Sequence, residues 1–398
     1  MGAEIKGEIS LLILNLSIAS IFGSLFGGPS LVYLVPRFSF RNLLIINYGW
    51  SILTALIVTV VVEAGFLPSS LSAGEFFFFS LLECLIATHF MLLLGYEQIK
   101  SNNWLQILKG ATTVFLLLFF WNQGGDFGFV SFSQAYGASL SITFLMSAIT
   151  LIASRKQMPK SADVEASWSK ALSACLTYGS LVQIGNIAQL LNYRLSFYFL
   201  ELMVHPPSLA LIRIGIYSAA LQVSEALWQF ARSVSTVQYA KVSNLSDERK
   251  GLSMSLKLGK LNYTVTALGI IVLLVIPETL YGRVFGAEFD EIKSHFALLS
   301  LGILAMSYSN ALSHFFAGIG QHRTNTISSV FGLVITAGLG YVAIDRWGTN
   351  GAAITASVTY LLQTLYQFYI LKKRQNVTWN AVILNRSDIL EFWRLIRK

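Results

Sequence analysis

The chain has 398 residues, of which 54% are hydrophobic and only 12% are charged. Soluble domains carry roughly a quarter charged residues, so this composition excludes an ordinary soluble protein and indicates a membrane protein. The net charge of +8 is spread over short connections and the C-terminus. That spread excludes a nucleic-acid-binding module and favours basic residues that lie beside anionic membrane lipid.

Long apolar runs predict membrane-spanning helices. Each run holds about 19 or more residues, enough to cross a hydrocarbon core about 30 Å thick, whereas a β-barrel would need alternating strands of about ten residues. The fold class is therefore an all-α polytopic membrane protein with about eleven transmembrane helices. The predicted spans are 9–33, 42–64, 76–96, 104–121, 130–153, 171–202, 210–238, 258–282, 292–318, 324–344 and 350–371.

Positive charge alternates between the connections and predicts the topology. Every second connection carries basic residues, which are Arg37, Arg41, Lys100, Arg155, Lys156, Lys160, Lys170, Lys241, Arg249, Lys250, Lys257, Arg323, Lys372, Lys373 and Arg374. The positive-inside rule makes these connections cytoplasmic, so we expect the N-terminus outside and the C-terminus in the cytoplasm.

The longest polar connection, Ser154 to Lys170, divides five predicted helices from six. We therefore expect an N-terminal helical lobe over 1–160 and a C-terminal helical lobe over 161–375. In the tail, 376–398, apolar residues at helical spacing predict an amphipathic helix on the cytoplasmic leaflet, and a frayed, solvated tail is the alternative.

A short internal repeat suggests that the two lobes are related. Gly7-Glu8-Ile9-Ser10 in the first helix resembles Gly215-Ile216-Tyr217-Ser218 in the seventh. A whole helix precedes the second copy, whereas only residues 1–6 precede the first. We therefore expect that the chain lacks the first helix of a six-plus-six design.

Helix 210–238 carries polar residues on one face. Spacings of three and four residues align a polar stripe made of Ser218, Gln222, Glu225, Gln229, Arg232 and Thr236. An ionisable residue at membrane depth costs at least about 2.5–3.5 kcal/mol, so it usually faces protein interior or a wet cavity. The polar stripe predicts a wet cavity, and a dry polar seam between helices is the alternative.

Helix 171–202 places Gln183, Asn186 and Tyr193 on roughly one face, with Arg194 nearby. Arg194 is too far from either helix end to reach the surface, and a guanidinium fork suits a diphosphate. An ion pair with Glu201 or Glu225 is the alternative.

Other intramembrane polar residues give weaker signals. Asn310 and His314 share a face of helix 292–318, and His314 is either a protonatable gate or a packing residue. Glu83 is a further candidate for a polar site. Lys109 and Arg213 lie near helix ends, where their side chains are expected to extend to the surface.

Nothing in the sequence assembles an active site. It contains no Ser/His/Asp order, HExxH motif or Walker loop, and Cys84 and Cys175 lie in apolar runs without a histidine at ligand spacing. We therefore predict a non-enzymatic protein with no cofactor and no metal site, and coupling to H⁺ or Na⁺ stays open.

Several motifs carry a family resemblance. Residues 183–195 (Gln-Ile-Gly-Asn-Ile-Ala-Gln-Leu-Leu-Asn-Tyr-Arg-Leu), with Tyr178-Gly179, 215–218 and 225–228, resemble the second-lobe signature of the polysaccharide and O-antigen flippases. These flippases belong to the multidrug/oligosaccharidyl-lipid/polysaccharide exporter (MOP) superfamily. Many relatives carry an acidic residue where this chain has Ser196, which puts ion coupling through that position in doubt.

The resemblance implies two helical bundles in a MATE-like V shape, five helices plus six, around a cavity that opens alternately to either side. Its implied substrate is an undecaprenyl-diphosphate-linked oligosaccharide, an O-antigen, capsule or exopolysaccharide repeat unit. The flippase would move it to the periplasmic leaflet of a bacterial inner membrane, beside anionic lipid and polysaccharide polymerase machinery.

In that reading the candidate cavity residues have distinct roles. Arg194 and Arg232 hold the diphosphate, and Glu225 is a counter-charge or coupling site. Hydrogen bonds to sugar come from Gln183, Asn186, Gln222 and Gln229. Two alternatives remain, a multidrug-type exporter and a membrane polymerase or ligase of polysaccharide assembly.

Overall fold

The structure is a computed structural model, and it describes residues 2–27, 31, 34–35, 38–96, 98–123, 128–154, 168–243, 247–375 and 377. Within these ranges the regular structure is helical, without a strand, which confirms the all-α prediction. The helices are α1 (Ala3–Gly27), α3 (Phe40–Glu63), α4 (Ala73–Gly95), α5 (Ile99–Asn122), α6 (Phe129–Ser154), α7 (Trp168–Met203), α8 (Pro207–Ser243), α9 (Glu248–Val275), α10 (Glu278–Phe285), α11 (Ile292–Gly318) and α12 (His322–Gln375), with a 3-10 turn, η1 (Ala287–Phe289). Apart from Val377, the predicted tail lies outside the described residues.

Each of the eleven predicted spans overlaps a described helix, and three of the differences in their boundaries bear on the site or the fold. α1 begins at Ala3 and not at residue 9. α9 begins ten residues before its predicted start, because Asp247 caps it by accepting hydrogen bonds from the amides of Arg249 and Lys250. Two predicted spans are joined in α12, where Gly348 alone has a non-helical backbone (φ 55°, ψ −129°) and makes a kink.

Composition and length mark most of these helices as membrane spans. Among the described residues, eight helices are long and apolar enough to cross a membrane, which confirms a multi-pass membrane protein. α7 and α8 are not among the eight. These two helices carry the polar stripe and Arg194, and some of their side chains lie outside the described residues.

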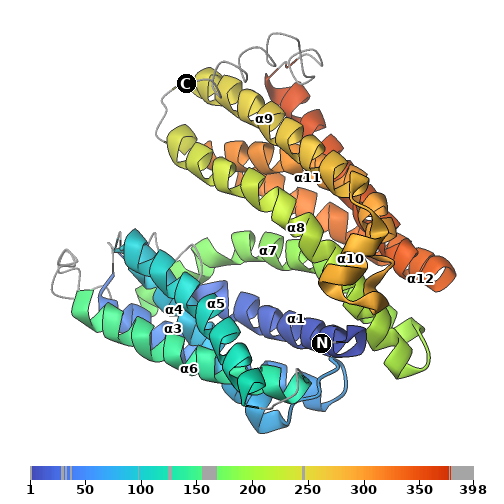
Figure 1. Ribbon diagram of the computed structural model, residues 1–398. Coiled ribbons are helices and arrows are strands. Elements are labelled where there is room, and N and C mark those ends of the chain that lie inside the picture. The colour runs from blue at the N-terminus through green and yellow to red at the C-terminus, as the bar shows by residue number, and fades with distance from the viewer. Residues whose placement is uncertain are drawn as a thin grey trace. The chain divides into compact units, whose positions relative to one another are not determined.

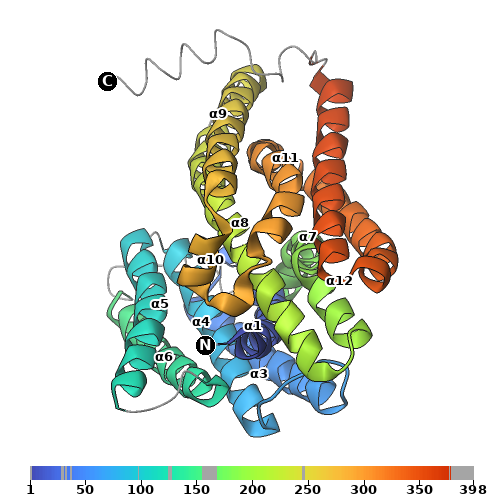
Figure 2. The same cartoon turned by 45° about the vertical axis from the view of Figure 1, so that its right-hand side comes forward.

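The helices form two compact units (Figures 1 and 2). Unit 1 contains residues 8–187 and unit 2 contains residues 2–7 and 188–398, so the division falls inside α1 and inside α7. The lobe boundary predicted at residue 160 lies in 155–167, outside the described residues, and stays a prediction.

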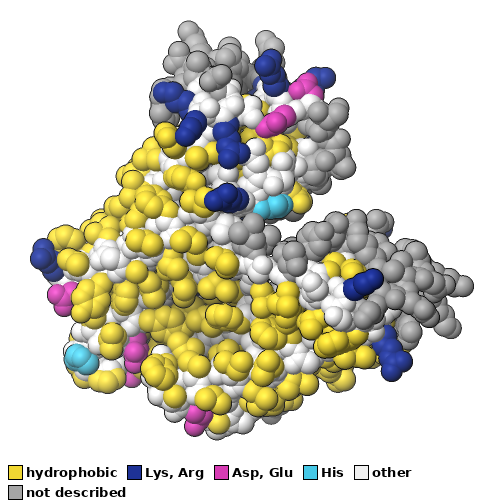
Figure 3. Space-filling view, turned by 180° about the vertical axis from the view of Figure 1, so that it is seen from behind, with side chains coloured by type: hydrophobic (Ala, Val, Ile, Leu, Met, Phe, Trp, Pro, Cys, Tyr) yellow, Lys and Arg dark blue, Asp and Glu magenta, His cyan; other side chains and the backbone are white. Residues whose placement is uncertain are grey.

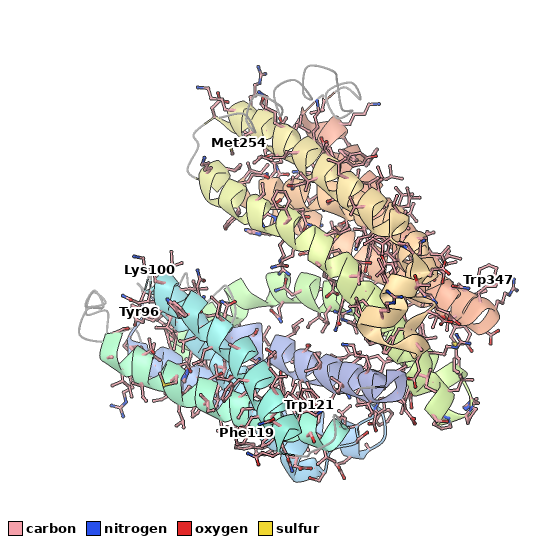
Figure 4. The ribbon with its side chains drawn as sticks, viewed as in Figure 1. Tyr96, Lys100, Phe119, Trp121, Met254 and Trp347 are labelled. Atoms are coloured by element: carbon pink, nitrogen blue, oxygen red, sulfur yellow. The ribbon has the colours of Figure 1, made fainter. Side chains whose placement is uncertain are left out.

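Unit 1 is built on α4, which packs against α3, α5 and α6. Leu12 and Leu16 of α1, Phe76 and Phe79 of α4 and Leu140 of α6 belong to one buried apolar core. The turn between α4 and α5 lies at one end of this unit, near Lys100, and Trp121 lies at the other end of α5 (Figure 4). An exposed tryptophan at a helix end is typical of the membrane interface.

Unit 2 is organised around α11, which packs against α8, α9 and α12. At one end of the unit, Leu312, Phe315 and Phe316 of α11 form a buried core with Leu256 of α9 and Leu371 of α12. The start of α9 and the end of α12 meet at this end, which Figure 4 marks by Met254, and the kink beside Trp347 lies at the opposite end. This bundle positions α8 and the polar stripe.

Two basic residues that were expected to extend to the surface form ion pairs instead. Lys109 Nζ lies 2.6 Å from Glu83 Oε1, and Tyr136 donates a hydrogen bond to the same carboxylate. Arg213 Nη1 lies 2.7 Å from Glu291 Oε2. The surface interpretation was wrong for Lys109, because the carboxylate of Glu83 on the neighbouring α4 is within reach. The side chains of Arg213 and Glu291 are 37% and 42% exposed, so their ion pair lies at the surface of the unit.

The Glu83–Lys109 pair predicts a stability effect inside unit 1. Their side chains are only 11% and 25% exposed, so Glu83→Gln or Lys109→Met leaves one buried charge without its partner. We expect each single variant to lower the free energy of unfolding by about 3 kcal/mol and the double variant to recover most of it. Thermal unfolding of the purified protein in detergent measures this cycle, and additive losses in the double variant would contradict it.

Candidate functional site

Helices α1 and α8 cross with their backbones in contact through the two copies of the internal repeat. A Cβ atom added at Gly7 would lie 1.9 Å from the carbonyl oxygen of Leu211. A Cβ atom added at Gly215 would lie 1.9 Å from the carbonyl oxygen of Ala3. Leu211 is four residues before Gly215, and Ala3 is four residues before Gly7. Each glycine therefore faces the carbonyl group that lies one turn before the other glycine, and the contact is reciprocal. Glycine is required here because only it allows two helices to approach so closely.

This crossing brings Lys6 to the polar stripe. Lys6 Nζ donates a hydrogen bond of 2.9 Å to Gln222 Oε1 on α8, and its charge interacts with Arg194 and Glu225. Lys6 was not predicted as a site residue, because it stands beside Glu4 and Glu8 before the predicted start of the first helix. The adjacent Gly7 of the repeat was the signal that could have pointed to it.

Arg194 of α7 pairs with Glu225 of α8. Arg194 Nη2 lies 2.6 Å from Glu225 Oε1, and the two side chains are 24% and 28% exposed. The guanidinium carbon also lies 5.5 Å from the centre of the Phe197 ring, within the range of a cation–π contact. Of the two carboxylates considered for Arg194, the structure selects Glu225. Since the pair is partly exposed, further N–H groups of Arg194 can still bind a ligand.

Arg232 lies further along the same face of α8 and is exposed. Its charge interacts with Tyr193 of α7 and with His314 of α11. His314 donates from Nδ1 to the backbone carbonyl of Asn310 at 2.8 Å, and its ring lies 6.3 Å from that of Tyr239. Side chains of α7 and α11 thus lie within electrostatic range of Arg232.

Aromatic rings support the back of this group. The ring of Tyr193 lies 5.1 Å from that of Trp228 on α8 and 5.7 Å from that of Tyr360 on α12. Trp228 and Tyr360 are buried. Tilted and edge-on ring contacts of this kind join α7, α8 and α12 next to Arg194.

Gln183 and Asn186 belong to a different unit from the residues of this group. Both belong to unit 1, where the buried Gln183 donates a hydrogen bond from Nε2 to the backbone carbonyl of Ile21 on α1. Asn186 is exposed and donates from Nδ2 to Gln183 Oε1 at 3.4 Å. Their role as sugar-binding residues stays a prediction.

The middle of the polar stripe is accessible from outside the protein. Gln222, Gln229 and Arg232 are exposed and Glu225 is half-buried, whereas Ser218 is buried and donates to the carbonyl of Gly215. The side chain of Thr236 lies outside the described residues. Three cations, Lys6, Arg194 and Arg232, thus accompany a single carboxylate among the described residues that these contacts join, which suits an anionic ligand.

Cysteine labelling tests the accessibility of the polar stripe. We expect a membrane-impermeant maleimide to label Gln229→Cys and Arg232→Cys. It should leave Ser224→Cys and Ser235→Cys unlabelled, because these two serines of the same helix are 1% and 0% exposed. The natural Cys84 and Cys175 are both buried and give little background. Equal labelling of all four positions, or of none, would contradict an accessible stripe.

Comparison with known proteins gives a family match over less than half of the chain. Residues 209–389 match the family model described as lipid II flippase MurJ. A capsular polysaccharide biosynthesis protein, CapF, from Staphylococcus aureus is 23% identical over 163 residues. That match covers 40% of this chain and 41% of the relative, so the chain spans less than half of that protein.

Two solved structures share the fold. A multidrug resistance MATE family transporter of the MOP superfamily, in an inward-facing conformation, has a TM-score of 0.70 at 13% identity, over 94% of this chain and 91% of that chain. A lipid II flippase MurJ in an inward closed conformation has a TM-score of 0.66 at 16% identity, over 94% and 82%. These likenesses confirm the expected MATE-like fold class.

Proposed function

We propose that the chain is a flippase of the MOP superfamily and that it moves a polyprenyl-diphosphate-linked oligosaccharide across a bacterial cytoplasmic membrane. The oligosaccharide would be a repeat unit of a cell-surface polysaccharide, carried from the cytoplasmic to the periplasmic leaflet. The basic connections support a topology with the C-terminus in the cytoplasm.

The observation that carries the proposal is the excess of positive charge around the polar stripe. Arg194 forms an ion pair with Glu225, the charge of Lys6 interacts with both, and Arg232 adds a third cation on the same face of α8. A diphosphate carries several negative charges on a compact group, and guanidinium forks bind such oxygens with two hydrogen bonds at once. A site for a cationic drug would instead carry carboxylates and aromatic faces.

The neighbouring amides suit the sugar part of the substrate. Gln222 and Gln229 are exposed, each about one helical turn from Glu225 on either side. An amide side chain donates and accepts hydrogen bonds, as sugar hydroxyls do, so the two glutamines can bind the first sugars while the cations hold the diphosphate.

A transport assay tests the proposal. The full chain is reconstituted in liposomes that contain a dye-labelled undecaprenyl-diphosphate oligosaccharide, and an impermeant reductant destroys the dye that faces outward. We expect the protein to expose the inner pool of dye, and Lys6→Gln and Arg232→Gln to slow this exposure. The exposed Lys100→Gln variant of unit 1 removes an equal charge elsewhere and should match the wild type (Figure 4).

Two outcomes would contradict the proposal. The inner pool could stay protected at the level of protein-free liposomes, although the protein is folded and incorporated. Alternatively, the protein could transport an amphiphilic cation such as ethidium and leave the lipid-linked sugar in place, which would identify a multidrug-type exporter.

A further inference from the structure

The kink in α12 forms the tip of a helical hairpin in unit 2. Thr336 Oγ1, before the kink, lies 3.1 Å from Thr359 Oγ1, after it, so the two halves of α12 run back along each other. Gly348 makes this reversal with a φ of 55°, a conformation that favours glycine. Trp347 therefore lies at the hairpin tip, at the end of unit 2 opposite the end that Met254 marks (Figure 4).

A pocket of about 340 Å³ opens beside this hairpin tip. Ligand pockets in proteins measure about 300–1,000 Å³, so this one holds a small ligand. Four segments of unit 2 form its walls: Val204 between α7 and α8, Arg213 of α8, Glu291 and Ser294 around the start of α11, and residues 347–350 of α12. Residues far apart in the sequence thus meet in one pocket, as they do in a binding site.

The charged groups of the lining balance each other. Arg213 Nη1 lies 2.7 Å from each of the two carboxylate oxygens of Glu291. Among the described residues that line the pocket, these two are the only charged ones. The pair therefore forms one wall of the pocket without giving the lining a net charge. Such a lining favours a neutral ligand over an anion or a cation.

The other side chains offer an aromatic face and hydrogen-bonding groups. Trp347 is 56% exposed, and its indole has an apolar face and an N–H donor. The exposed amide of Asn350 both donates and accepts hydrogen bonds. The hydroxyl of the exposed Ser294 donates to the carbonyl of Glu291 at 2.8 Å, so its oxygen can accept from a ligand. Among the described residues of the lining, Val204 is the only aliphatic one, which is too little for an acyl chain.

The pocket lies where water-soluble molecules reach the protein. Hydrophobic side chains cover most of the face shown in the space-filling view, and charged side chains lie mainly at its margins (Figure 3). Two of the pocket's segments are connections between predicted spans, 203–209 and 345–349. The basic residues Lys372, Lys373 and Arg374 follow at the other end of the second half of α12. The proposed topology therefore places the pocket on the periplasmic side.

We propose that this pocket binds a neutral saccharide. The C–H face of a pyranose ring packs on the indole of Trp347, and its hydroxyl groups exchange hydrogen bonds with Asn350 and Ser294. The polar stripe has different chemistry, because its three cations suit a diphosphate. The pocket is thus a second binding site, and its ligand class follows from the lining and does not rest on the proposed function.

Saturation-transfer-difference NMR of the full chain in lipid nanodiscs tests the site. The probes are three neutral disaccharides, cellobiose, lactose and N,N′-diacetylchitobiose. We expect at least one of them to bind, with the strongest saturation transfer to its ring C–H protons. Trp347→Ala should abolish this signal, and Trp347→Phe should keep part of it because an aromatic face remains. Asn350→Ala should weaken the affinity about tenfold, as expected for the loss of its hydrogen bonds.

Trp121→Ala is the matched control, because Trp121 is also 56% exposed but belongs to unit 1. It should bind the saccharide as the wild type does, and thermal unfolding verifies that each variant is folded. Absence of saturation transfer from the folded wild type to all three disaccharides would overturn the proposal, and so would an unchanged signal in Trp347→Ala. Displacement of the bound saccharide by an equal concentration of inorganic phosphate would show an anion site and overturn the assignment to a neutral ligand.

Discussion

Replacement of Arg194 by glutamine is expected to lower the transport of a diphosphate-linked lipid about 10- to 100-fold. A charge-assisted hydrogen bond contributes about 1.5–3 kcal/mol, which corresponds to that factor in binding. The Arg194–Glu225 pair is about a quarter exposed, so Arg194 can contact a ligand while Glu225 holds it in place. Uptake into proteoliposomes measured against substrate concentration should show the loss mainly in apparent affinity.

Replacement of Glu225, the ion-pair partner of Arg194, should affect stability more than transport. Glu225→Gln leaves Arg194 and Lys6 side by side without the carboxylate that interacts with both. We expect a lower thermal unfolding temperature from the repulsion between these two cations, and a smaller loss of transport because a diphosphate can replace the missing negative charge. Added undecaprenyl diphosphate should therefore raise the unfolding temperature more in Glu225→Gln than in the wild type.

The double variant Arg194→Gln/Glu225→Gln separates stability from transport. Since it carries neither charge, its stability should recover toward that of the wild type while its transport stays low. Arg213→Gln is the matched control, because Arg213 forms an ion pair of similar length with Glu291 in the same unit. It should lose stability and keep transport. Recovery of transport in the double variant would show that the pair is only structural.

The sequence predicted the helices and the main polar helix face because both depend on local periodicity. Runs of apolar residues define membrane spans whatever the neighbours are, and the spacing of Gln222, Glu225, Gln229 and Arg232 places them together on any helix. The kink at Gly348 was also visible, as the gap between two predicted spans. The predicted start of α1 was wrong, because the charged residues at positions 4, 6 and 8 were taken to lie outside the membrane span. Lys6 in fact belongs to the helix and contacts Gln222 on α8.

Contacts between distant segments could not be predicted from periodicity. The sequence offered two carboxylates for Arg194 and a surface position for Lys109, and only the packing of neighbouring helices decides that these two residues meet Glu225 and Glu83. The repeat around Gly7 and Gly215 was found, but it suggested related lobes. The structure adds that its two copies touch each other, which a single sequence does not indicate.

Substitution of alanine for Gly7 or Gly215 is expected to reduce transport more than tenfold and to lower the thermal unfolding temperature. In each variant the new Cβ atom would lie 1.9 Å from a backbone carbonyl oxygen, so the two helices must part by more than about an ångström. Backbone atoms cannot turn aside as a flexible side chain can. Lys6 would then move away from Gln222, and a displacement of about 1 Å at a binding group can cost about a hundredfold in activity.

Gly338→Ala provides the matched control. Gly338 lies within α12, and an added Cβ atom there meets no atom within 4 Å. An alanine at such a position should leave transport unchanged and leave the unfolding temperature equal or slightly higher, since glycine is a weak helix former. A similar loss in this variant would show that any glycine substitution harms the protein, and the crossing of α1 and α8 would need no special explanation.

The double variant Gly7→Ala/Gly215→Ala tests whether the two glycines act at the same helix crossing. Both added Cβ atoms push the same two helix backbones apart. Once the helices have separated to accommodate one Cβ atom, the other Cβ atom causes a much smaller steric clash. The loss of stability in the double variant should therefore be well below the sum of the two single losses, as expected for residues in direct contact. Additive losses would mean that the two glycines act at separate places, and that α1 does not hold Lys6 beside the polar stripe through this contact.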